Sequence, residues 1–288
     1  MSYILAQASA HRLPLRDETV QCVVTSPPYF GAVRQYEGTQ HIVEWGGALG
    51  SERSPEAYVC HMVEVGREMR RILKPDGAFW LNIGEVYAAS GKGGGGNQGD
   101  RASWATINTR AGYRMPPAGY KPKDLTLAPF KVAEALRVDG WYLRSTVVWR
   151  KPAAVEPMRL DRPALSHEYL FLLTKARHYS TRDPGESWWG HSVWDINPSL
   201  NSAHPGTFPD ELPRRCIVAS SHPEDVVLDP FNGSGTTGAV ALRLGRRYVG
   251  LDLSREYLTQ QAIHRVDPLA GAAQDARDGT SGQQVMAL

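Results

Sequence analysis

The segment Thr25-Ser26-Pro27-Pro28-Tyr29 combines residue types that are suited to holding a planar amino group. Proline has no backbone N–H and a fixed φ, so the two prolines stiffen the turn and leave backbone carbonyls as hydrogen-bond acceptors. The Ser26 hydroxyl and the Pro27 carbonyl can both accept from an –NH₂ group, and Tyr29 can stack on the ring that carries it. Alone, the segment is equally a proline-stiffened turn. The segment indicates amine binding only when a second motif predicts a cofactor site in the same sheet.

The second site is a glycine-rich turn, Asp229-Pro-Phe-Asn-Gly-Ser-Gly-Thr-Thr-Gly238, which lies between an apolar run and a helical stretch at residues 239–244. Its glycines follow the spacing G-x-G-x-x-G, which permits a tight turn and a close backbone approach to a nucleotide-like ligand. Asp252 closes the next apolar run, where a carboxylate can accept hydrogen bonds from ribose hydroxyls. The pattern predicts a cofactor-binding turn.

Asp229 bears on the identity of that cofactor. In a dinucleotide fingerprint the strand usually runs straight into the first glycine, whereas residues 229–232 intervene here. A carboxylate at this place would repel a pyrophosphate but could hold an amine. This favours S-adenosylmethionine, a cation without phosphate, over NAD.

The elements that must position these residues alternate between strands and helices. Ser54-Pro55 begins a helix with one apolar face, which residues 74–77 stop, and a second helix spans residues 125–138. Alternation of this kind predicts an α/β fold with a mostly parallel sheet that is covered on both faces. Six apolar or β-branched runs are predicted as buried strands, at residues 20–25, 78–83, 146–149, 169–173, 226–228 and 248–251.

Length and composition set the bounds of the fold. With 288 residues, 42% of them hydrophobic and 22% charged, the chain can form one large α/β domain and its core. Three cysteines far apart predict neither a disulfide framework nor a zinc cluster, and no metal is expected. No membrane span or signal peptide is visible, so a reducing cytoplasmic location is expected, in a protein of bacterial, archaeal or phage origin.

Charge and low-complexity segments suggest the division of the chain. Residues 101–151 hold ten Lys or Arg against three acids, with Trp104, Tyr113, Tyr120, Trp141 and Trp149 between the charges, which is typical of a polyanion-binding face and equally of a solvated basic surface. We predict a catalytic half at residues 1–175 with a mobile loop at 88–120, a target-recognition insertion at 176–207, a cofactor-binding half at 208–267 and a tail at 268–288. The recognition segment is extended to 155–207, with Trp188, Trp189 and Trp194; these aromatic residues could equally form a core.

The two motifs, in this order, resemble the β-class amino-group DNA methyltransferases, which methylate N4 of cytosine or N6 of adenine. The similarity covers about residues 3–265 and implies a Rossmann-like S-adenosylmethionine-dependent methyltransferase fold with permuted motif order. Further segments with counterparts in the family are residues 13–20, 73–77, 148–152, 204–209 and 250–253.

The resemblance also implies site residues. Ser26, Pro27, Pro28 and Tyr29 would hold the target base, and Arg150 and Lys151 are candidates for DNA phosphate contacts. The implied cofactor-binding residues are Phe208, Pro209, Asp229, Phe231, Asn232, Gly233, Ser234, Gly235, Thr236, Asp252 and Leu253. Two positions depart from the family: Ala8-Ser9 stands where relatives have Gly-Asp, and Gln21 replaces an acid of the catalytic strand.

The expected function is methyl transfer to a cytosine N4 amine that is flipped out of double-stranded DNA, because Ser rather than Asp before Pro-Pro-Tyr leans towards cytosine in this family. N6-adenine methylation is the alternative, and a restriction endonuclease is a possible partner. None of the three cysteines follows a proline, as C5-cytosine chemistry would require. His167-Glu168 lies in a strand-like run, where packing is the simpler role. A NAD-dependent oxidoreductase and a non-catalytic DNA-binding module remain as rivals.

Overall fold

The computed structural model describes residues 2–31, 48–88, 119–152, 161–181, 183–198 and 207–269. Along the chain, the elements are β1 (Tyr3–Gln7), β2 (Val20–Thr25), α1 (Pro55–Ile72), β3 (Leu73–Ile83), α2 (Ala128–Val138), β4 (Tyr142–Arg150), β5 (His167–Thr174), the 3₁₀ turn η2 (Ser187–Gly190), β6 (Val193–Asp195), α3 (Glu211–Ser220), β7 (Val226–Asp229), α4 (Thr236–Arg243), β8 (Arg247–Asp252), α5 (Arg255–Tyr257) and the π-helical turn η3 (Leu258–Ala262).

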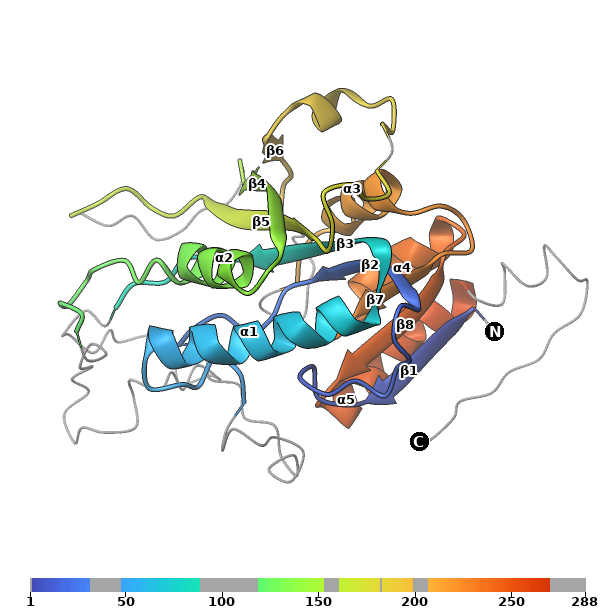
Figure 1. The fold of residues 1–288 in the computed structure, drawn as a ribbon, viewed down its shortest axis with the longest axis horizontal. Coiled ribbons are helices and arrows are strands. Elements are labelled where there is room, and N and C mark those ends of the chain that lie inside the picture. The colour runs from blue at the N-terminus through green and yellow to red at the C-terminus, as the bar shows by residue number, and fades with distance from the viewer. Residues whose placement is uncertain are drawn as a thin grey trace, which may run out of the picture.

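One eight-stranded sheet runs through the molecule in the order β1-β8-β7-β2-β3-β5-β4-β6 (Figure 1). Only β5 is antiparallel to its two neighbours, β3 and β4, and the other five pairings are parallel. The predicted mostly parallel sheet is therefore confirmed. Each of the six predicted strands falls within an observed strand.

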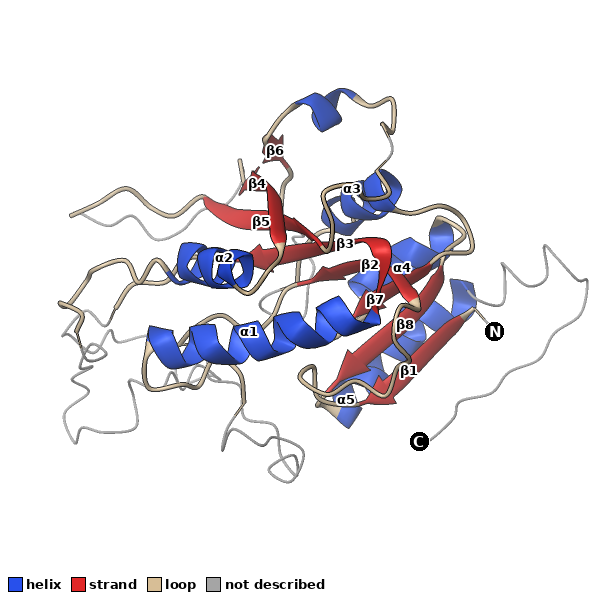
Figure 2. Cartoon of the chain, in the orientation of Figure 1, coloured by secondary structure: helices blue, strands red, loops and turns tan. Residues whose placement is uncertain are grey.

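Helices cover both faces of this sheet (Figure 2). Buried residues of α1 and α2 share one hydrophobic cluster, which also contains Val23 and Phe79. Buried residues of α3 and α4 share another, which contains Val24 and Trp80. Neighbouring residues of β2 and β3 thus point to opposite faces, as the two-residue period of a strand requires.

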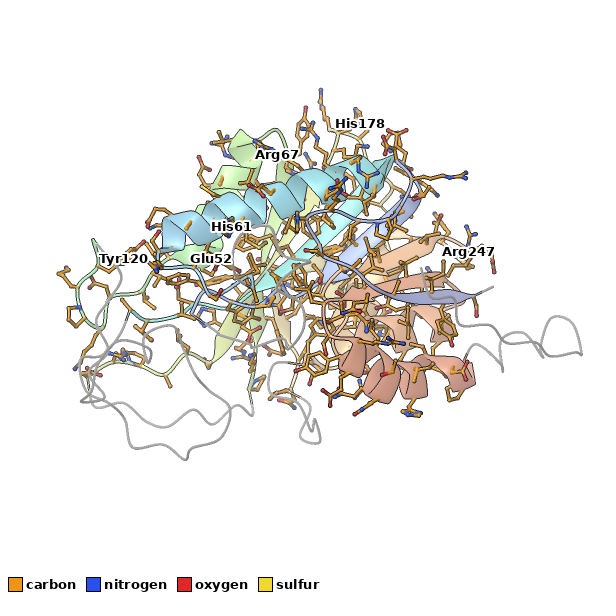
Figure 3. The ribbon with its side chains drawn as sticks, turned by 90° about the horizontal axis from the view of Figure 1, so that it is seen from below. Glu52, His61, Arg67, Tyr120, His178 and Arg247 are labelled. Carbon is orange, nitrogen blue, oxygen red and sulfur yellow. The ribbon has the colours of Figure 1, made fainter. Side chains whose placement is uncertain are left out.

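Polar contacts hold α1, the long helix on the first of these faces, near its start and in its second half (Figure 3). Near its start, His61 Nδ1 lies 2.9 Å from Glu52 Oε1, which ties the segment before the helix to its first turns. Further along, Arg67 forms an ion pair with Asp139, the residue that follows α2, at 2.6 Å. The two helices are therefore held together at the surface as well as through the core beneath them.

The helices that follow β2 and β7 lie on opposite faces, although the two strands are adjacent. In an open α/β sheet, ligands bind beyond the carboxyl ends of the strands at such a topological switch point. The Ser-Pro-Pro-Tyr segment follows β2 and the glycine turn follows β7, so the topology brings both predicted motifs to this place.

Two predicted boundaries are wrong. The helix α1 ends at Ile72, but residues 74–77 belong to β3 rather than to a stop before the strand. Val20 pairs with Leu73 and Cys22 with Ala78, so the extra residues form a bulge that the turn-like composition of residues 74–77 did not reveal. α2 begins at Ala128, because Leu127 takes a left-handed conformation (φ 55°) before it.

The structure decides between the recognition role and the core role for two tryptophans of the 176–207 segment. β6 adds to the sheet beside β4, and Trp188 and Trp194 are buried in the cluster that contains Trp80. The Trp80 and Trp194 rings lie 6.0 Å apart. These two side chains are core, while a recognition role for the rest of the segment stays a prediction.

Several predictions fall on residues outside the described ranges: most of the 88–120 loop, residues 199–206 and the tail from 270. Among the described residues, no helix is both long and apolar enough to cross a membrane, and no cluster of His, Cys, Asp or Glu has the makings of a metal site. Cys22 and Cys216 are buried, Cys60 is exposed, and all three are free thiols.

Candidate active site

The Ser-Pro-Pro-Tyr tip leaves the sheet at the end of β2 and is held from two sides. Pro27 is buried, and the Pro28 carbonyl accepts a hydrogen bond from the Tyr58 hydroxyl of α1 at 3.1 Å. Ser26 is half-buried, and its hydroxyl donates to Tyr29 Oη at 3.3 Å. The tip is therefore a turn that hydrogen bonds hold in place, with Ser26 partly exposed.

Tyr29 is fixed through its hydroxyl. Its Oη lies 2.7 Å from Glu168 Oε2 on β5 and 3.1 Å from Asn82 Oδ1 on β3. Gly84 makes room for the ring, since a Cβ there would lie 2.6 Å from Tyr29 Cε2. Burial, together with the charge of Glu168, raises the pKa of Tyr29 well above its usual value, so the phenol stays protonated.

The glycine turn joins β7 to α4 in a conformation that other residues rarely adopt. Gly235 has φ 82° at the residue before the helix, and a Cβ there would lie 3.0 Å from Ala262 Cα. Asn232 stabilises the turn, because its Oδ1 accepts the Tyr248 hydroxyl at 2.6 Å and its Nδ2 donates to the Gly233 carbonyl. Gly235 thus lets the turn pack closely against Ala262 of η3, and Asn232 fixes the conformation of the turn.

Asp229 connects the glycine turn to the catalytic strand. The Thr25 hydroxyl donates to its Oδ1 at 2.5 Å, the Phe231 N–H donates to the same atom, and the Thr237 hydroxyl donates to Oδ2. Asp229 is 2% exposed, and burial raises its pKa to about 6 in spite of these donors. Its carboxylate therefore organises the turn and the strand, and both of its oxygens already have partners.

Asp252 ends β8 on the other side of the turn. Its Oδ2 accepts the Gly233 N–H and its Oδ1 accepts the Ser254 N–H, both at 2.8 Å. The carbonyl of Leu253 accepts the Gln7 amide. The predicted ribose contact thus lies against the glycine turn, as the sequence order suggested.

One direct observation supports the binding of a nucleotide-like cofactor at this turn. Ser234 Oγ, between the two left-handed glycines, is buried and has no hydrogen-bond partner in the described part of the chain. An unpartnered buried hydroxyl is costly unless a ligand satisfies it. Ser234 is among the residues predicted to bind the cofactor.

The other predicted cofactor residues are divided between the two faces. Phe231 packs against the cluster of α1 and α2, whereas Phe208 is buried in the cluster of α3 and α4. The Pro209 carbonyl accepts the Leu212 N–H at the start of α3, and the Thr236 hydroxyl accepts from Arg265. The aromatic rings therefore flank the switch point from opposite sides.

The two residues predicted to contact DNA phosphates both form ion pairs with acidic side chains. Arg150 pairs with Asp195 of β6, and both side chains are about half exposed. Lys151 pairs with Glu168 and lies 4.4 Å from the centre of the Trp149 ring. Lys151 therefore belongs to the contacts around Tyr29, in addition to any role on DNA.

The two departures from the family pattern have partners of their own. Ser9 Oγ lies 2.6 Å from His11 Nδ1, just after β1. The Gln21 amide nitrogen lies 3.4 Å from the Asp76 carbonyl, at the bulge of β3. Ser9 and Gln21 are both uncharged, so neither departure places an unbalanced charge in the protein interior.

Sequence reasoning missed three functional candidates: Thr25, Asn82 and Glu168. Thr25 was quoted only as part of the motif, although its hydroxyl carries the link to Asp229. For the other two, the signal in the sequence was a polar residue within an otherwise apolar strand, and for Glu168 packing was taken as the simpler role. Both contact Tyr29 because β2, β3 and β5 are successive strands of the sheet.

The glycine turn and the Ser-Pro-Pro-Tyr tip meet at one switch point of a mostly parallel sheet with helices on both faces, which is a Rossmann-like methyltransferase fold. Solved structures agree: a PvuII DNA methyltransferase (cytosine-N4-specific) superposes with a TM-score of 0.68 at 19% identity, covering 98% of this chain and 94% of that one. A putative DNA modification methylase from Thermus thermophilus, solved with S-adenosyl-L-methionine, has a TM-score of 0.62 at 23% identity, covering 93% and 94%.

Sequence comparison is more specific. The model of a family described as DNA methylase matches residues 20–263. The Type II methyltransferase M.XycI of Xanthomonas campestris pv. cyanopsidis is 43% identical over 262 residues, 87% of this chain and 82% of that protein. M.Cfr9I of Citrobacter freundii is 42% identical over 258 residues, 86% and 81%. The chain belongs to the N6/N4 DNA methylase family, and it is an amino-group DNA methyltransferase.

Proposed function

We propose that the protein transfers a methyl group from S-adenosylmethionine to the N4 amine of a cytosine in double-stranded DNA. The observation that carries this is the 2.5 Å hydrogen bond between Thr25, next to Ser26, and Asp229 of the glycine turn. It fixes the amine-holding tip beside the cofactor turn. This proximity and orientation are what a direct transfer between two bound reactants requires.

The tip polarises the target amine. In cytosine the amine lone pair is delocalised into the ring and is a poor nucleophile. Ser26 Oγ and the Pro27 carbonyl accept the two amine hydrogens, which localises the lone pair and aims it along the line of transfer. No covalent enzyme intermediate is needed, and the buried Cys22 and Cys216 take no part.

The glycine turn holds the methyl donor. When the cofactor is bound, Ser234 Oγ and the backbone of Gly233 and Gly235 would face it, Asp252 would contact its ribose, and Phe208 and Phe231 would enclose it. The cofactor supplies an electrophilic methyl group on a sulfonium. Asp229 acts on it mainly by shaping the turn, because its oxygens are already hydrogen-bonded.

The target base must leave the duplex to reach this tip, and Tyr29 replaces part of the stacking that is lost. Arg150 is about half exposed at the end of β4, so it can leave Asp195 and pair with a DNA phosphate instead. The rest of the 176–207 segment reads the sequence. A restriction endonuclease of the same specificity is the expected partner in the cell.

Cytosine is favoured by Ser26 at the first position of the motif and by the solved neighbour whose name states cytosine-N4 specificity. N6-adenine methylation is the second candidate, because the same pair of acceptors can hold an adenine amine. Family membership removes the NAD-dependent alternative.

The test is mass spectrometry of nucleosides from unmethylated DNA after incubation with the protein and S-adenosylmethionine. N4-methylcytosine is expected, with a rate that falls at least about 100-fold in Ser26→Ala. Ser180→Ala is the matched control, since this half-buried serine lies near Asp76, at the opposite end of the sheet. N6-methyladenine would overturn the base assignment, and no modified base would leave a binding-only protein.

A further inference from the structure

A chain of contacts leads from Ser26, after β2, through Tyr29 to Glu168 on β5 and then to Lys151, after β4. Ser26 Oγ donates to Tyr29 Oη at 3.3 Å, and Tyr29 Oη donates to Glu168 Oε2 at 2.7 Å. The other oxygen of Glu168 contacts the ammonium of Lys151 after β4. The hydrogen bonds therefore connect Ser26, which would contact the proposed target amine, to the Glu168 carboxylate, and Lys151 pairs with that carboxylate.

The neighbours of Tyr29 determine the direction of every bond. Asn82 Nδ2 donates to the Tyr169 carbonyl at 3.1 Å, so its Oδ1 faces Tyr29 as an acceptor. Glu168 is an acceptor as well, so the single hydroxyl hydrogen of Tyr29 must point towards these oxygens. Tyr29 Oη can then only accept from Ser26, and the Ser26 lone pairs remain for the amine.

The sheet register explains why these groups meet. Thr25 pairs with Leu81, Asn82 with Leu170, and Trp149 with Glu168, so the four strands present the groups at the same level of the carboxyl edge. Gly84 allows the approach, because a Cβ there would lie 2.6 Å from Tyr29 Cε2 and 3.3 Å from Glu168 Cγ. The contact is therefore built into the strands.

We infer that Glu168 accepts, through Tyr29 and Ser26, the proton that the target amine loses on methylation. This inference rests on the proposed function. The amine nitrogen forms a bond to the methyl carbon as the carbon–sulfur bond breaks, and the electron pair of that bond stays on sulfur, which becomes a neutral thioether. The nitrogen then carries one positive charge and one proton too many.

The relay removes that proton in three coupled transfers. The amine proton passes to Ser26 Oγ, the Ser26 proton to Tyr29 Oη, and the Tyr29 proton to the Glu168 carboxylate. Ser26 and Tyr29 end neutral, and Glu168 becomes a carboxylic acid. The side chains of Lys151 and Glu168 are 20% and 16% exposed, so the proton can leave to solvent between turnovers.

A simpler role would be that Glu168 only orients the Tyr29 ring. Glu168→Gln separates the two, because a glutamine carbonyl still accepts the Tyr29 hydrogen but is a far weaker base. We expect the single-turnover rate constant, at saturating DNA and S-adenosylmethionine, to fall about 100-fold or more, with both dissociation constants within about threefold of wild type. A rate within about threefold of wild type would overturn the inference.

Two further variants address the charge that Glu168→Gln leaves on Lys151. Adding Lys151→Gln makes the pair neutral; if charge balance were the only function of Glu168, the double variant would recover the wild-type rate and refute the relay. Adding Tyr29→Phe to Glu168→Gln should cause little further loss, since both changes cut the same path. Glu18→Gln is the matched control: it pairs with Lys175 at the far end of β5 and should not alter the rate.

The same assay separates this inference from the proposed function. If wild-type protein forms N6-methyladenine, the base assignment fails, but the variants still test the relay on an exocyclic amine. If wild-type protein forms no methylated base, both the function and the relay are refuted. If it forms N4-methylcytosine and Glu168→Gln is as fast, only the relay fails.

Discussion

Replacing Thr25 by valine tests the link between the catalytic strand and the cofactor turn. The change removes the hydroxyl that donates to Asp229 and keeps the shape of the side chain. A hydrogen bond to an ionised group contributes about 1.5–3 kcal/mol, and one between neutral groups about 1 kcal/mol. Thr25→Val should therefore lower the free energy of unfolding by about 2 kcal/mol at pH 8 and by about 1 kcal/mol at about pH 4.5, where Asp229 is protonated.

The pH dependence follows from the direction of the Asp229 shift. Burial raises its folded-state pKa to about 6, about two units above the unfolded value, which corresponds to about 3 kcal/mol. This contribution to stability is fully present below the unfolded pKa and is lost as the pH rises through about 6. Thr25→Val should raise the pKa further, by about one unit, because the ionised form loses a donor.

Urea unfolding at the two pH values measures both effects. Thr174→Val is the control, since that buried hydroxyl donates to the neutral Ala176 carbonyl at 2.9 Å and its loss should cost the same at either pH. Equal destabilisation by Thr25→Val at the alkaline and the acidic pH would refute the claim that Asp229 is ionised and supported by Thr25.

Three further substitutions follow from the packing. Gly84→Ala places a methyl group 2.6 Å from the Tyr29 ring and should slow methyl transfer about 100-fold while calorimetry shows unchanged cofactor affinity; an unchanged rate would mean that the Tyr29 position is unimportant. Gly238→Ala places one 2.4 Å from the fully buried Tyr248 ring and should cost about 1–3 kcal/mol in urea unfolding, despite the better helix propensity of alanine. Trp194→Ala should cost about 3–5 kcal/mol in the same assay, whereas a residue that read DNA would lose DNA affinity at unchanged stability.

The parts of the site that are contiguous along the chain could be predicted from local residues. The Ser-Pro-Pro-Tyr tip and the glycine turn carry their own backbone requirements, namely proline-fixed φ and left-handed glycine, so each could be placed directly. Apolar runs were enough to predict six of the eight strands and the mostly parallel sheet, whereas β1 and β6 were not predicted. Asp252 could be placed because it closes the strand after the turn.

The contacts between strands could not be predicted in the same way. Glu168 reaches Tyr29 only because β5 inserts antiparallel beside β3, and this pairing leaves no local mark in the sequence. Trp194 was ambiguous because an aromatic residue at an irregular segment can face either solvent or core. Trp194 faces the core because it belongs to the short strand β6. This strand has three residues, which are too few to give a periodic pattern in the sequence.

The position of the site also explains why the order of the two motifs along the chain is free. What the reaction needs is that β2 and β7 are adjacent and that their helices leave on opposite faces, and both conditions are properties of the sheet. Thr25 and Asp229 are 204 residues apart in sequence, yet they lie within one hydrogen bond. A protein that carried the glycine turn first would present the same pair, because the contact depends on strand order and not on chain order.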